Sequence, residues 1–150
     1  MPSTHGLISR LRIDYPQLRL APGPTMMWEP QTQTIYYRKG CTNAELLHEL
    51  GHALLGHAEY ARDIMLLEHE RDAWSQAAKL ASHYGTTISK DAIDDHLDTY
   101  RDWLHARSIC PSCQANGIQV KTNVYECPAC QSRWRVNEAR SCALRRQQIK

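Results

Sequence analysis

The stretch that decides how this chain is interpreted is His48-Glu49-Leu50-Gly51-His52. Residues four apart lie on one face of a helix, so His48 and His52 can present their imidazoles to one metal ion. Helices of zinc peptidases carry this HExxH spacing, with the glutamate as general base. We therefore interpret His48 and His52 as zinc ligands and Glu49 as the catalytic residue. The alternative is a core helix in which both histidines are incidental.

The residues around this motif predict a helix from about Asn43 to Leu55, because the segment is rich in leucine and alanine. Thr42 and Glu45 fit a capping box at its start, and Gly56 is placed to end it. A glycine in the interior costs roughly 1 kcal/mol relative to alanine. We therefore expect Gly51 to mark close packing beside the metal site.

Other segments predict a mixture of helices and short strands. Residues 25–38 contain two β-prone runs around a polar turn, which we interpret as a hairpin. The second run leads directly into the motif helix, so we expect it to be an edge strand along the active-site cleft that can pair with an extended peptide. Further helices are expected within 7–18, over 61–83, and from the N-cap Ser89 to about Leu104.

A catalytic zinc ion usually has three protein ligands and an open position for water, so a third ligand is needed. The expected helix over 61–83 contains the candidates His69 and Glu70. Glu70 shares its helical side with small and apolar residues that favour packing against the motif helix, namely Ala73, Trp74 and Ala77. His69 points about 100° away from Glu70, so one orientation of the helix uses only one of them. We favour Glu70 and keep His69 as the alternative third ligand.

Residues 47–57, which read Leu-His-Glu-Leu-Gly-His-Ala-Leu-Leu-Gly-His, and the segment Glu70-Arg71-Asp72-Ala73-Trp74 together resemble the ImmA/IrrE metallopeptidases. The resemblance covers roughly residues 25–85. It implies that Glu70 is the third zinc ligand, that Asp72 stands where the family often has a second glutamate, and that Trp74 replaces a common asparagine. Family members include proteases that cleave a repressor, so the resemblance implies a substrate such as a transcriptional repressor or regulator.

The chain also resembles SprT-like proteases, which join an HExxH helix to a C-terminal zinc ribbon. Those proteins use a downstream histidine near a tryptophan as third ligand, which corresponds here to His69. This second resemblance implies a protease that acts on DNA-bound proteins. The spacing after His52 fits the ImmA/IrrE pattern more closely.

Two CxxC pairs, Cys110-Pro111-Ser112-Cys113 and Cys127-Pro128-Ala129-Cys130, are separated by 13 residues. This spacing predicts a zinc ribbon with a structural zinc ion bound by Cys110, Cys113, Cys127 and Cys130, and a β-hairpin within 118–126. A disulfide or redox role is the alternative, but two matched pairs without an export signal fit thiolate ligands better. Cys41 and Cys142 have no partner in this scheme, and we assign them no role.

Charge is distributed unevenly along the chain. The net charge is +2, yet residues 1–106 carry 10 basic and 14 acidic side chains, whereas residues 107–150 carry 8 and 2. A basic region favours an acidic partner such as nucleic acid, although four zinc-bound thiolates would cancel part of the charge. Trp134 is available to stack on a base, and phosphates can be met by Arg133, Arg135, Arg140, Arg145, Arg146 and Lys150. The alternatives are a solvated tail and a ribbon that only stabilises the chain or docks a protein.

No stretch of 18 or more apolar residues exists, and the N-terminus lacks the pattern of an export signal. We therefore expect a cytoplasmic protein with no membrane partner.

Peptide hydrolysis also requires a donor that stabilises the tetrahedral transition state. The candidates near the motif are His57, Tyr60, His83 and Tyr84.

Together these features predict an α+β chain with a zincin-like domain over 1–106, a zinc ribbon over 107–136 and a basic tail over 137–150. In the zincin-like domain we expect a small antiparallel sheet packed on the helices that carry HExxH. Two zinc ions per chain are expected, one catalytic and one structural. The expected function is that of a zinc-dependent metalloendopeptidase acting on a protein or peptide. The alternative is a non-catalytic zinc-ribbon protein that binds nucleic acid or a protein partner.

Overall fold

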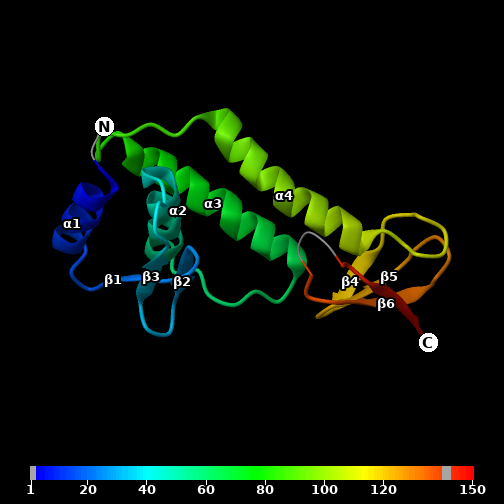
Figure 1. Ribbon diagram of the computed structural model, residues 1–150. Helices are drawn as coiled ribbons and strands as arrows, with labels where there is room; N and C mark the ends of the chain where they lie inside the picture. The colour runs from blue at the N-terminus through cyan, green and yellow to red at the C-terminus, as the bar shows by residue number, and fades with distance from the viewer. Residues whose placement is uncertain (1–2, 140–142) are drawn as a thin grey trace. The chain divides into compact units, whose positions relative to one another are not determined.

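The computed structural model describes residues 3–139 and 143–150, and the chain is α+β as expected. The chain divides into two compact units, Met1–Glu59 with Glu68–Ile93, and Tyr60–Leu67 with Asp94–Lys150 (Figure 1). The two long helices, α3 (Asp63–Ala81) and α4 (Lys90–Ser108), each contribute residues to both units. Arg140, a candidate phosphate contact, and Cys142, to which we assigned no role, lie outside the described residues. No described helix combines the length and the apolar character that a bilayer crossing requires.

The first unit contains helix α1 (Thr4–Asp14) and a sheet of β1 (Arg19–Pro22), β2 (Met27–Glu29) and β3 (Thr34–Tyr37). The predicted hairpin is confirmed, because β2 and β3 pair antiparallel. The sheet as a whole is mixed, however, since β1, a strand that the sequence analysis did not predict, pairs parallel with β3. The expectation of a purely antiparallel sheet was therefore wrong.

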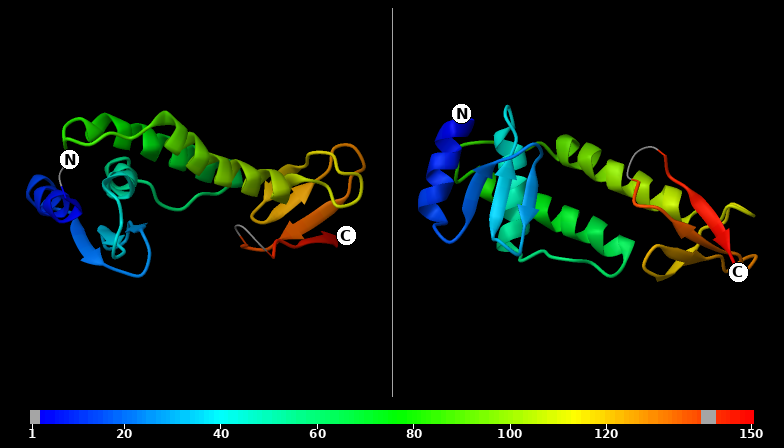
Figure 2. Two further views of the ribbon diagram at one scale, coloured as in Figure 1. Left: turned by 45° about the horizontal axis from the view of Figure 1, so that its top comes forward. Right: turned by 60° about the horizontal axis from the view of Figure 1, so that its bottom comes forward.

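The order of these strands is β1-β3-β2, which places β3 in the middle of the sheet (Figure 2). We had expected the strand that leads into the motif helix to be an edge strand, and this expectation was wrong. The physical reason is burial, because Thr34 and Ile35 of β3 are almost fully enclosed, whereas Met27 of β2 is exposed. Among the three strands, β1 and β2 form the two edges.

Helix α2 (Asn43–Leu54) carries the HExxH motif and begins as predicted. The Thr42 hydroxyl accepts the Glu45 backbone N–H at 3.1 Å, and the Glu45 carboxylate accepts the Thr42 backbone N–H at 2.7 Å. This reciprocal capping box satisfies two donors at the helix start. Arg38 also pairs with Glu45, at 2.6 Å. Gly56 follows the helix with a φ of +67°, which suits the residue that ends it.

Helices α3 (Asp63–Ala81) and α4 (Lys90–Ser108) match the two long helices expected from the sequence. Gly85 follows α3 with a φ of +69°. The Ser89 hydroxyl accepts the Ala92 backbone N–H at 3.1 Å, which confirms Ser89 as the N-cap of α4.

The second unit contains a four-stranded antiparallel sheet in chain order, formed by β4 (Ile118–Lys121), β5 (Val124–Glu126), β6 (Arg133–Val136) and β7 (Arg146–Ile149). The predicted hairpin within 118–126 is confirmed as β4 and β5. Strands β6 and β7 were not predicted. Because β7 pairs with β6, part of the segment that we had described as a tail belongs to the sheet.

A buried ion pair fixes the segment Tyr60–Leu67 to the second unit. The Arg107 guanidinium contacts the Asp63 carboxylate at 2.8 Å, and both side chains are at most 5% exposed. The Tyr125 hydroxyl donates to the same carboxylate at 2.5 Å, and Arg107 donates to the side chain of Asn123 at 2.7 Å. Buried charges require such complete pairing, because an unpaired one would retain its full desolvation cost.

Candidate metal centres

Three predicted ligands meet between α2 and α3. The Nε2 atoms of His48 and His52 lie 3.1 Å apart, and the Glu70 carboxylate lies 2.8 Å from the first and 3.3 Å from the second. All three side chains are buried. Residues 22 positions apart in the chain therefore form one cluster, in which each residue offers one ligand atom.

A close approach of the two helices makes this cluster possible. A Cβ atom built on Gly51 would overlap the carbonyl oxygen of Ala73 and lie 3.1 Å from its Cα. Any side chain at position 51 would therefore push α3 away from α2. The prediction that Gly51 marks close packing is confirmed. Ala73 and Ala77, which are both fully buried, are the small residues that we expected on this face of α3.

The spacing of the ligand atoms fits a zinc ion. Zinc binds imidazole nitrogen and carboxylate oxygen at about 2.0–2.2 Å in tetrahedral geometry, which separates neighbouring ligand atoms by roughly 3.3 Å. The three separations of 2.8–3.3 Å come close to that value. Two nitrogens and one oxygen also form a ligand set that is common in catalytic zinc sites. Glu49, only 9% exposed, lies between the two histidines in the sequence of α2.

Aromatic rings from α3 and from the segment after α2 contact the rings of His48 and His52. The indole of Trp74 stacks on His48, with ring centroids 4.2 Å apart. The sequence had placed Trp74 on the side of α3 that packs against the motif helix, but it had not predicted the stacking on His48. The alternative ligand His69 instead stacks on His57 at 4.2 Å, and it is not among the residues that form the His48, His52 and Glu70 cluster.

The four candidates for a transition-state donor have different environments. The Nδ1 atom of His57 contacts that of His52, whereas the Tyr84 hydroxyl donates to Asp14 at 2.6 Å. Burial and that hydrogen bond raise the pKa of Tyr84 above its usual range. His83 is exposed, and Tyr60 belongs to the second unit.

The second cluster contains Cys110, Cys113, Cys127 and Cys130. The sulfurs of Cys110 and Cys130 lie 3.6 Å apart, and those of Cys113 and Cys127 lie 3.5 Å apart. Zinc–sulfur bonds of about 2.3 Å in a tetrahedron separate the sulfurs by roughly 3.8 Å, whereas a disulfide bond measures about 2.05 Å. The cysteines are free thiols, so their spacing fits a metal ion and not the alternative disulfide role.

The two cysteine turns have the same local structure. Each has the sequence Cys-Pro-x-Cys-Gln, and the glutamines Gln114 and Gln131 both have a φ of +64°. In each turn the glutamine N–H donates to the carbonyl of the first cysteine at 2.9 Å. The shared glutamine is a sequence signal for this turn that we had not used.

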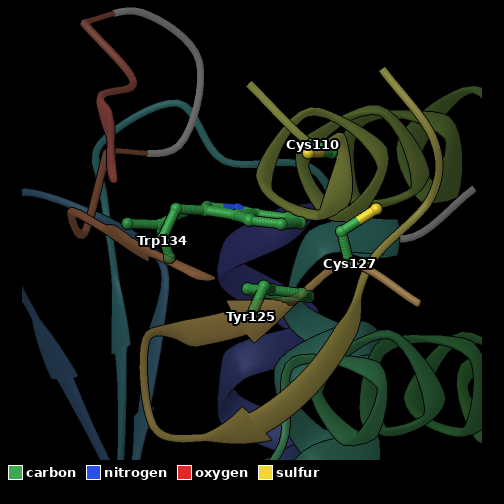
Figure 3. Close-up of a cluster of buried hydrophobic side chains, with 5 residues drawn as sticks. Cys110, Tyr125, Cys127 and Trp134 are labelled. Carbon is green, nitrogen blue, oxygen red and sulfur yellow. The ribbon is translucent and has the colours of Figure 1, made fainter. Parts of the chain in front are cut away.

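Trp134 has a structural role that excludes the base stacking considered as one alternative from the sequence. Its side chain is 0% exposed, its indole N–H donates to the Arg107 carbonyl at 2.9 Å, and its ring is stacked parallel to that of Tyr125 beside Cys110 and Cys127 (Figure 3). A base cannot reach a ring that is fully enclosed. The alternation of β6 explains the error, because Trp134 and Val136 face the core while Arg135 faces solvent.

The arginines of this unit differ in their surroundings. Arg133 pairs with Glu126 at 3.3 Å. Three other arginines line a hollow of about 640 Å³, together with Val136, Asn137 and Gln147; they are Arg135, Arg145 and Arg146. Within residues 3–139 and 143–150, no carboxylate side chain forms an ion pair with these three.

Comparison with known proteins gave no match to any family model, any curated protein or any solved structure. The argument about function therefore depends on the residues and geometry of the two clusters. The first cluster offers nitrogen and oxygen atoms that could bind a metal, on two packed helices. The second offers four sulfur atoms that could bind a metal, on two turns.

Proposed function

We propose that this protein is a zinc-dependent metalloendopeptidase that hydrolyses a peptide bond in a protein substrate. The observation that carries the proposal is the convergence of His48 and His52 of α2 with Glu70 of α3 in one buried cluster, next to Glu49 on α2. Ligand geometry alone suits many metal sites. A glutamate inside the HExxH spacing adds the general base that peptide hydrolysis needs.

The proposed mechanism assigns a task to each residue. His48, His52 and Glu70 would hold the zinc ion, which supplies a Lewis acid for the scissile carbonyl and lowers the pKa of the attacking water. Glu49 accepts a proton from that water as the water oxygen bonds to the carbonyl carbon. Glu49 then returns the proton to the leaving nitrogen as the C–N bond breaks.

The resemblances narrow the substrate class. The ImmA/IrrE-like pattern with Glu70 as third ligand makes a repressor or another regulatory protein the substrate that we favour. The alternative SprT-like activity on DNA-bound proteins would use His69 as ligand. The stacking of His69 on His57, rather than on the cluster, supports the first assignment.

The test combines zinc content with turnover. We expect two zinc ions per wild-type chain by elemental mass spectrometry, and cleavage of a quenched-fluorescence peptide library. Glu49→Gln should keep both zinc ions and lose activity by about 10²–10⁴-fold, the usual contribution of a general base. Wild-type turnover by Glu49→Gln would refute the mechanism. A wild-type chain with only the ribbon zinc would instead favour the non-catalytic binding protein.

We propose as a second function that the ribbon binds nucleic acid through its phosphates. The supporting observation is the hollow lined by Arg135, Arg145 and Arg146, whose charges no described carboxylate side chain neutralises. Because Trp134 is enclosed, the hollow offers arginines without an aromatic platform for bases. Binding should therefore depend strongly on salt and weakly on sequence.

The chain provides a matched control for this second proposal. Arg135→Gln and Arg133→Gln each remove one positive charge from β6, but only Arg135 lines the hollow, and Arg133 is paired with Glu126. Fluorescence anisotropy with a labelled duplex should show weaker binding for Arg135→Gln, with the salt slope reduced by about 0.9. Equal effects of both variants, or no binding at low salt, would contradict a phosphate site in the hollow.

A further inference from the structure

His57 is held from several sides next to the metal ligand His52. Its backbone N–H donates to the His52 carbonyl at 3.0 Å, and its own carbonyl accepts the indole N–H of Trp28 at 2.9 Å. Its ring stacks almost parallel on His69, at 4.2 Å and 12°. Hydrogen bonds hold the backbone of His57 and the stacking on His69 holds its ring.

The fixed ring directs one nitrogen at the metal ligand. Nδ1 of His57 lies 2.9 Å from Nδ1 of His52. The Nε2 atom of His52 lies on the opposite side of its ring, 3.3 Å from the Glu70 carboxylate and 3.1 Å from Nε2 of His48. His52 therefore faces the cluster with one nitrogen and His57 with the other.

This arrangement has a chemical requirement. A neutral imidazole has one N–H donor and one acceptor nitrogen, so two facing Nδ1 atoms bond only if one carries the proton. A histidine that binds a metal through Nε2 carries its proton on Nδ1, and usually donates it to a carboxylate, a carbonyl or water. His57 is placed to accept that proton, because its Nδ1 lies 2.9 Å from Nδ1 of His52 and its ring is held in this orientation by stacking on His69.

We propose that His57 is a positioning residue for the metal site, accepting the Nδ1–H of His52 through its own Nδ1 and so holding His52 in the tautomer that leaves Nε2 free for the metal. This inference depends on the proposed zinc site. It gives His57 a task different from the transition-state donor considered from the sequence. It also gives His69 a task, since His69 holds the ring of His57 by stacking.

The test separates the acceptor atom from the size of the side chain. His57→Asn places an acceptor oxygen where Nδ1 of His57 was. His57→Leu gives a side chain of nearly the same shape as asparagine but without an acceptor. Both variants lose the ring that stacks on His69. The zinc affinity of the helix site is measured by competition with a graded chelator, and the zinc retained by the four cysteines serves as an internal reference.

We expect His57→Leu to bind zinc at the helix site 10–100-fold more weakly than wild type, as is typical when a partner of a ligand is lost. His57→Asn should recover most of that affinity. Equal affinities for the two variants would overturn the positioning role, whether both match wild type or both are weak. If the wild-type protein retains only the ribbon zinc, the proposed metalloprotease site itself is refuted. The zinc count of the wild-type protein therefore separates this failure from a failure of the positioning role, before any variant is compared.

Discussion

The two metal-ligand clusters are assembled in opposite ways. Each cysteine pair lies within a turn of four residues, and the two turns are joined through neighbouring strands of one small sheet. His48, His52 and Glu70 come instead from two helices whose backbones touch at Gly51 and Ala73. The first cluster is built from local turns, whereas the second is built from tertiary packing.

This difference suggests different roles for the metal ions that we propose at the two clusters. The sheet of the second unit encloses a small core cluster of Cys110, Tyr125, Cys127, Trp134 and Val136, and two of these five residues are candidate metal ligands. A zinc ion there would contribute directly to folding. The helix cluster belongs to a unit that buries apolar residues from α1, the sheet and α2, so we expect this unit to fold without metal. The following predictions test this contrast, beginning with the largest effect.

Removal of one ribbon ligand should have the largest effect. We expect Cys127→Ser to lose one zinc ion and to unfold the sheet of β4–β7, because structural zinc contributes apparent binding free energies on the order of 10–16 kcal/mol in zinc-finger peptides. Hydrogen exchange should show lost amide protection over 110–136, while the helix site keeps its zinc. Cys41→Ser, a change at a buried cysteine outside the cluster, is the control and should keep both ions. Retained protection in Cys127→Ser would show that the ribbon folds without its metal.

Removal of one ligand from the helix cluster should abolish metal binding with much less unfolding. Glu70→Ala should weaken zinc binding at this site by more than about 100-fold, beyond the range typical for outer-sphere partners. Circular dichroism should show the helices intact, and the ribbon zinc should remain. His69→Ala is the matched control and should bind zinc more tightly than Glu70→Ala. The reverse order would assign the third ligand to His69.

Separation of the two helices should have an intermediate effect. Alanine favours a helix by roughly 1 kcal/mol over glycine, so Gly51→Ala would stabilise α2 in isolation. In this fold the added methyl group meets the backbone of Ala73, and we expect a net loss of about 1–3 kcal/mol together with weaker zinc binding. Urea unfolding and chelator competition measure the two quantities. Increased stability with unchanged zinc affinity would mean that the helices have room to adjust.

A change at the start of α2 should have the smallest effect. Thr42→Ala removes the hydroxyl that accepts the Glu45 N–H, and typically such a loss costs about 1 kcal/mol. We expect a small decrease in the urea midpoint and no change in the zinc content of either site. Loss of zinc in this variant would show that the helix site depends on the cap as well as on the contact between α2 and α3.

Prediction from sequence succeeded where the signal is local. The capping box of Thr42 and Glu45, the hairpin of β2 and β3, and the N-cap Ser89 each depend on residues within a few positions of one another. Prediction failed where distant segments meet. Strand β1 pairs parallel with β3, and β7 pairs with β6 after the connection 137–145, although neither β1 nor β7 has a sequence periodicity that distinguishes it from a loop.

The sequence by itself determined which chemical groups are present and which of them share a helix face or a turn. It placed His48 and His52 four residues apart and each cysteine pair within one turn, because those spacings are fixed by backbone geometry. Only the tertiary structure decided that Glu70 meets the two histidines, that His57 faces His52, and that Trp134 is enclosed. These outcomes depend on how side chains from separate elements fill shared space, a property that no short stretch of sequence contains.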